Sequence, residues 1–120
     1  MGRGIADALD QKAQRRINLQ MACMRNAAAV LDLCQREKLS GFDAINVATA
    51  LHRIAKLAEG GRNATLKDSA ESLLARAARA AQSGEFQAQA LANTAWSLAT
   101  LSWNDEPLLA AIAVAACDQI

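Results

Sequence analysis

The residues able to do covalent or metal chemistry are few in this chain. The sequence has three cysteines, Cys23, Cys34 and Cys117, and a single histidine, His52. The cysteines are odd in number, show no CxxC spacing and stand among apolar residues, which favours buried free thiols in a reducing compartment over a metal or redox site. One histidine cannot form a metal cluster, and no serine or cysteine has a neighbouring base at a suitable spacing. We therefore predict that this chain is not an enzyme and that it holds no metal and no cofactor.

Hydrogen-bonding side chains form a more informative pattern. At about 100° per residue, four uncharged polar residues fall within one narrow arc of a predicted helix. They are Gln89, Asn93, Ser97 and Thr100. The equivalent arc of an earlier helix carries Ile45, Thr49, Arg53 and Lys56, with Asn46 alongside. Amides and hydroxyls pair with exposed base edges, while Arg and Lys meet phosphates, so the two arcs predict a surface for single-stranded RNA. A solvated helix face is the alternative interpretation.

Two aromatic residues and two arginines leave further alternatives open. Trp96 and His52 occupy equivalent positions at the border of the two arcs, where each either packs in the core or stacks on a base. Trp103 lies just past the helix and either lines the same groove or covers the core. Arg76 and Arg79 are expected on an outward side, as a solvated face or as a track for phosphates.

The composition indicates that these residues are positioned by helices. Half of the chain is apolar (52%), Tyr is absent, and only two Phe and two Trp are present. Alanine-rich, aromatic-poor sequences favour close-packed helices over sheets, so we predict an all-α fold. The net charge of +1 provides no global attraction to nucleic acid or membrane, so an anionic partner must bind a local patch. No apolar run approaches the roughly 20 residues of a membrane span.

Helical periodicity divides the chain into a charged segment and a helical-repeat domain. Residues 1–16 form the charged N-terminal segment, either helical or frayed, and residues 17–120 form the repeat domain. Within this domain we predict a partial repeat over 17–41, a repeat over 42–85 and a repeat over 86–120. The expected helices cover about 27–38, 43–58, 65–81 and, from residue 86 or 87, up to 101, and a last helix opens near Pro107, which suits a first helical turn.

An internal match supports this division. The segment Phe42–Leu57 aligns without a gap on Phe86–Leu101 at an offset of 44 residues, with identical Phe, Ala and Leu positions. The following helices align at an offset of 35 residues, with Leu73 over Leu108. A two-helix unit cannot bury its apolar stripe alone, so neighbouring units must stack. The sequence therefore predicts an α-solenoid of antiparallel helix pairs with about two and a half repeats.

The last helix, Leu108–Cys117, is apolar nearly all round. An end cap should turn a polar face to water. We therefore expect a protein partner, a further repeat or an RNA-bound partner to cover this helix.

The second repeat resembles the helical repeats of organellar RNA-binding proteins of the octotricopeptide and FAST-kinase-like type. Residues of that family's core motif fall in register here: Phe86, Gln89, Leu91, Ala92, Asn93, Trp96, Leu98, Ala99 and Leu101. The segment from Val30 to Ala58 looks like a divergent copy, and the resemblance covers about Ala27 to Cys117. The family commonly carries a RAP domain, which this sequence lacks, so no catalysis is implied.

The resemblance implies an α-solenoid that holds single-stranded RNA along its concave face. Such a module would serve RNA processing, stability or translation in a mitochondrion or plastid, or would be a ribosome-associated subunit of a ribonucleoprotein. The competing prediction is a scaffold for protein–protein interaction in a larger complex, because near-neutral charge and an apolar last helix suit that function equally well.

Overall fold

The computed structural model describes residues 2–37, 39–58 and 64–119. Over these residues the chain is helical and contains no strand, which confirms the all-α prediction. The elements are α1 (Gly2–Cys23), α2 (Ala27–Arg36), a 3-10 turn η1 (Leu39–Gly41), α3 (Ala44–Leu57), α4 (Ala64–Ser69), α5 (Glu71–Gln82), α6 (Ala88–Leu101) and α7 (Glu106–Asp118).

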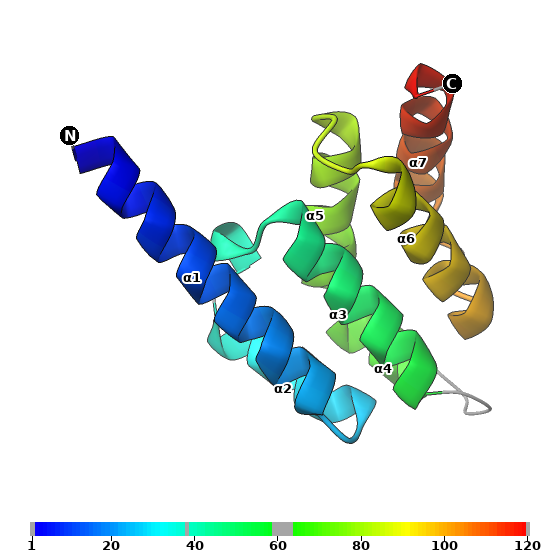
Figure 1. The fold of residues 1–120 in the computed structure, drawn as a ribbon. Helices are drawn as coiled ribbons and strands as arrows, with labels where there is room; N and C mark the ends of the chain where they lie inside the picture. Colours follow the sequence, from blue (N-terminus) through cyan, green and yellow to red (C-terminus); the bar gives the residue numbers. More distant parts are fainter. Residues whose placement is uncertain (1, 38, 59–63, 120) are drawn as a thin grey trace.

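The helices lie in two layers (Figure 1). Helices α1, α3 and α6 lie side by side and run in the same direction, with α3 packed between the other two. Helices α2, α5 and α7 form the second layer, behind the first. In it, α2 and α5 contact α3, while α7 contacts α5 and α6. The buried apolar side chains of both layers form one core.

Helix α1 continues through the boundary that we predicted after residue 16. No glycine or proline interrupts the sequence between Ile5 and Cys23, so nothing ends the helix there. Ile17 and Met21, one turn apart, are buried and fasten this helix to the core. Asn26 then caps α2, because its side-chain oxygen accepts a hydrogen bond from the backbone N–H of Ala29 at 2.8 Å.

Helices α3 and α6 begin and end at matching positions of the internal alignment. Each has 14 residues and starts two residues after a buried phenylalanine, Phe42 or Phe86. The carbonyl of each phenylalanine accepts a hydrogen bond of 2.8 Å from the second layer. Arg76 of α5 donates to Phe42, and Gln119 after α7 donates to Phe86. The outward position predicted for Arg76 is therefore wrong, whereas Arg79 is exposed.

The second layer differs from the predicted helices at one point. The helix expected over 65–81 is divided into α4 and α5, with Ala70 in a turn conformation (φ −96°, ψ 6°) between them. The start of α7 is as predicted: Asp105 caps the helix by accepting from the N–H of Leu108 at 2.9 Å, and Pro107 lies in the first turn.

The conformation of the chain between α6 and α7 determines where Trp103 lies. Ser102 ends α6 in the left-handed conformation (φ 57°), and the N–H of Trp103 donates back to the carbonyl of Leu98 at 3.0 Å. Trp103 is thereby turned into the core, where it is buried. It covers the core and does not line a groove.

Candidate nucleic-acid interface

A groove of about 380 Å³ runs between α3 and α6. It brings together three residues of the predicted arcs: Thr49 from α3, and Gln89 and Asn93 from α6. Ile45 lies beside them with an exposed side chain. The acidic residue of the groove, Glu85, pairs with Arg76 at 3.2 Å. The groove thus presents uncharged hydrogen-bonding groups next to apolar surface, which suits the edges and faces of unpaired bases.

His52 and Trp96 form an aromatic pair across the same two helices. Their ring centroids lie 5.1 Å apart and their planes are tilted by 51°. The Trp96 side chain is 46% exposed, so one part of the indole packs on the imidazole while the rest faces solvent. Burial, followed by the charges of Lys56 and Arg53, lowers the pKa of His52 below its usual 6.5, which leaves the imidazole neutral at pH 7.

Asn46 does not belong to the accessible surface. Its side chain is fully buried and its Nδ2 donates to the Oδ1 of Asn18 at 2.7 Å and to the carbonyl of Gln14 at 2.9 Å, both on α1. Its Oδ1 accepts from the N–H of Asp43, while the Asp43 carboxylate accepts from the N–H of Asn46, which is a capping box. Asn46 holds α3 on α1 and is not available to RNA.

Ser97 is also buried, for a different reason. Its hydroxyl donates to the carbonyl of Asn93 at 2.6 Å, one turn earlier on α6. Thr94 does the same toward Ala90 at 2.8 Å, and it too is fully buried. Small hydroxyl residues can face a neighbouring helix because they satisfy their own hydrogen bonds within the helix. The prediction that Ser97 meets RNA is therefore wrong.

The remaining predicted residues lie at or near the surface. Lys56 and Thr100 are exposed. Arg53 is half-buried: its terminal nitrogen donates to the carbonyl of Met24 at 2.9 Å, and its Nε is buried without a hydrogen-bond partner among the described residues. Part of the guanidinium of Arg53 thus serves the junction between α3 and the end of α1. Of the two cations in the predicted arcs, Lys56 is the exposed one.

A basic hollow on α1 was missed by the sequence reasoning. Lys12, Arg15, Arg16 and Leu19 line it, and the Leu19 side chain is 69% exposed. Arg16 pairs with Glu37, just after α2, at 3.3 Å, and all three basic residues, Lys12, Arg15 and Arg16, are exposed. The spacing of these residues by three and four positions was the available signal, since it places them on one helix face.

The cysteines follow the prediction only in part. Cys34 is buried, and burial raises the pKa of its thiol to about 12, so it stays an unreactive apolar group. Cys23 and Cys117 are free but exposed, so the expectation of burial is wrong for these two. The described residues contain no group of His, Cys, Asp and Glu side chains arranged to hold a metal ion. None of the described helices is long and apolar enough to cross a membrane.

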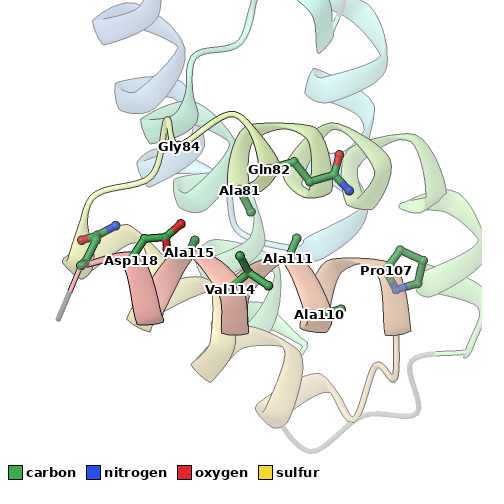
Figure 2. A pocket seen from close by; sticks show the side chains of 10 residues that line it. Ala81, Gln82, Gly84, Pro107, Ala110, Ala111, Val114, Ala115 and Asp118 are labelled. Carbon is green, nitrogen blue, oxygen red and sulfur yellow. The ribbon is translucent and has the colours of Figure 1, made fainter.

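A second hollow, of about 610 Å³, lies on the opposite layer between α5 and α7 (Figure 2). Alanines of both helices, among them Ala81 and Ala111, form its floor. Val114 projects from α7 at its side with 64% exposure, and Asp118 is the one charged residue that lines it. A single carboxylate over an alanine floor provides neither a nucleophile nor an acid–base pair.

Comparison with known proteins gives no match: no family model, no curated protein and no solved structure shows significant similarity to this chain. The resemblance to organellar RNA-binding repeats therefore stays a prediction from the motif residues.

Proposed function

We propose that this chain is a non-catalytic helical-repeat module that binds single-stranded RNA along the side formed by α1, α3 and α6. In this proposal the helix pairs are units of a short α-solenoid, and the two matched helices α3 and α6 each provide part of the binding surface. The resemblance stated above would place the module in organelle RNA processing, stability or translation, or in a ribosome-associated complex.

The half-exposed Trp96 is the observation that carries the proposal. The Trp96 side chain is 46% exposed, so a base that stacks on it would cover the part of the ring that faces solvent. The tilted contact with His52 holds the ring in place. Stacking of a base on an aromatic side chain contributes about 1–3 kcal/mol and tolerates any base. The groove beside the ring presents Thr49, Gln89 and Asn93 for hydrogen bonds to a base edge.

Cations for the phosphates are few, which sets the expected strength of binding. Lys56 is exposed on α3, and Lys12 and Arg15 are exposed on α1. For single strands, the logarithm of the affinity falls with the logarithm of the salt concentration by about 0.7 per phosphate contact. Three contacts would give a slope of about −2 and measurable binding at low salt only.

Fluorescence anisotropy with a labelled single-stranded RNA, titrated at several salt concentrations, tests the proposal. We expect Trp96→Ala to weaken binding by roughly 5- to 150-fold, the equivalent of one lost stacking contact. Lys56→Gln should reduce the salt slope by about 0.7 and weaken binding to all sequences alike.

Val114→Ala is the matched control, because it also shortens an exposed apolar side chain but lies on the opposite layer. Undetectable binding at low salt, or an equal loss in the Trp96 and Val114 variants, would contradict the proposal. In that case the protein-interaction scaffold becomes the better explanation, since apolar surface on the last helix pair favours a protein partner.

A further inference from the structure

The outer side of the last helix pair carries apolar side chains that no other part of the described structure covers. We define this outer face by three alanines of α6, Ala88, Ala92 and Ala99, and by Leu109, Ala113 and Ala116 of α7. All of these side chains are at least partly exposed, and none is charged. A hollow of about 300 Å³ runs between the two helices on this side, with Ala92 and Ala116 on its walls.

The same kind of face is covered elsewhere in this molecule. At an offset of 44 residues, the counterparts of the three α6 alanines are Ala44, Ala48 and Ala55 of α3, which are buried. Ala44 and Ala48 lie at the junction with α6. Ala44 and Ala48 of α3 are thus covered by the next helix, and their α6 counterparts have no such neighbour among the described residues.

The second layer repeats this relationship. At an offset of 35 residues, the counterparts of Leu109, Ala113 and Ala116 are Leu74, Ala78 and Ala81 of α5, and these are buried as well. Helix α7 packs against α5 in this region, where Ala81 and Ala111 share one hollow. The outer face is therefore a second copy of a surface that this chain buries under a helix pair.

The opposite end of the molecule does not match this face. There, at the end of the molecule formed by α1 and α2 (Figure 1), Arg16 forms an ion pair with Glu37, and Lys12, which lines the same hollow as Arg16, is exposed. Placing these charges against alanines in a head-to-tail assembly would remove water from them without new partners, which is unfavourable. An uncharged face fits best on another uncharged face.

We propose that the outer face is the contact surface of a homodimer, in which a second copy of this chain presents its own outer face. The contact is then isologous, and the two copies of α6 cross a two-fold axis in opposite directions. The spacing of Ala88, Ala92, Ala95 and Ala99 by four, three and four residues keeps them on one stripe. Side chains this small let the two backbones approach closely.

The dimensions of the face set the expected affinity. Helices of 13 and 14 residues are about 20 Å long, and packed helices lie about 8–10 Å apart, so the face measures roughly 20 Å by 20 Å. A stable interface of standard size buries about 800 Å² on each partner. The outer face offers about half of this area, so we expect a weak dimer, with a dissociation constant of about 10–100 µM.

Sedimentation velocity on the full chain, from about 1 to 500 µM, tests the proposal. We expect a shift from monomer to dimer over this range. Ala92→Glu should weaken the dimer at least about tenfold, because it places two buried like charges near the axis. Ala110→Glu is the matched control, since Ala110 is an exposed alanine of α7 that lines the hollow toward α5 and lies outside the outer face.

A charge exchange distinguishes the isologous contact from other assemblies. Ala92→Glu and Ala92→Arg should each be monomeric alone and should form a mixed dimer when combined, because the two positions meet across the axis. A wild-type monomer at the highest concentration, equal effects of the Ala92 and Ala110 variants, or growth beyond a dimer would overturn the proposal. None of these results depends on whether the α1, α3 and α6 side binds RNA.

Discussion

Helices α3 and α6 are built alike but meet different neighbours. Both have 14 residues, and both follow a buried phenylalanine. At equivalent positions they carry His52 and Trp96, whose rings contact each other. Helix α3 is held on α1 by the side chain of Asn46, which donates to Asn18 and to the carbonyl of Gln14. The corresponding side of α6 carries Ala90 and Thr94, which make no such hydrogen bonds to α3 and whose small size allows close packing.

This difference shows that two helices of the same length can pack on a neighbouring helix in two different ways. At the α1–α3 junction, directed hydrogen bonds between side chains and backbone set the register. At the α3–α6 junction, small residues set the distance between the backbones, and hydroxyls such as that of Ser97 are satisfied within their own helix. Substitutions at matched positions of the two helices should therefore change the free energy of unfolding by similar amounts at the buried phenylalanines. At the two junctions they should change it by different amounts.

The largest effect is expected at the two phenylalanines. Phe42→Ala and Phe86→Ala should each lower the free energy of unfolding by about 3–5 kcal/mol, because each removes a buried ring and leaves a cavity. Urea denaturation followed by circular dichroism measures both. If the alanine variants do not fold, the Phe→Leu variants should each lose less than about 2 kcal/mol. A strongly unequal loss at the two positions would break the equivalence of the helices.

Asn46→Ala should come next, with a loss of about 2–3 kcal/mol. The substitution removes the capping box and leaves the Oδ1 of Asn18 without its donor in a half-buried position. Asn93→Ala on α6 is the control, and we expect it to change the free energy of unfolding by less than about 0.5 kcal/mol. The same denaturation experiment compares them, and equal losses would mean that Asn46 does not hold the α1–α3 junction.

A matched alanine pair sharpens the comparison at the second junction. Ala48→Leu should lower the free energy of unfolding by about 1–3 kcal/mol, because Ala48 is buried at the junction with α6 and a larger side chain must either push α6 away or turn into the adjoining groove. Its counterpart Ala92 is exposed, so Ala92→Leu should stay within about 0.5 kcal/mol. Thermal unfolding at low protein concentration measures both variants. A similar loss at the two positions would show that the outer face of α6 is already filled.

The smallest effect concerns His52, the counterpart of Trp96. A nuclear magnetic resonance titration of this single histidine should give a pKa below 6.5, and Lys56→Gln should move the pKa upward by removing a nearby charge. The unfolded chain then takes up the proton at a higher pH than the folded chain, so the free energy of unfolding falls as the pH drops through this window. His52→Gln should remove that part of the pH dependence, and an unshifted pKa would contradict the prediction.

Much of the local structure could be predicted from the sequence. The bounds predicted for α3 and α6 differ from the observed ones by one or two residues at most, because apolar periodicity, Asp43 and the phenylalanines mark the helix ends. The break at Ala70 could not be predicted, since alanine is the best helix former and carries no signal for a turn. The predicted boundary after residue 16 lies inside α1, because the thin apolar stripe of the first 16 residues gives little evidence that they belong to one helix with the residues that follow.

The candidate site was predicted less well. Thr49, Gln89 and Asn93 do meet in one groove, and Lys56 and Thr100 are exposed. Asn46 and Ser97 were assigned to the same surface although they lie inside the molecule. A helical wheel orders residues around one helix, but it does not say on which sides neighbouring helices will lie.

The amino-acid sequence by itself determined the helices, their matching lengths and the apolar stripe of each, because these depend on local propensity and on a period of 3.6 residues. Only the tertiary structure decided which polar residues are buried. Helix α1 covers one side of α3 and forms hydrogen bonds with Asn46, while α6 covers the opposite side. The side chain of Arg76 is likewise directed inward because the carbonyl of Phe42, 34 residues away, accepts its hydrogen bond. Burial of a polar group depends on a partner distant in sequence, and no local pattern contains that partner.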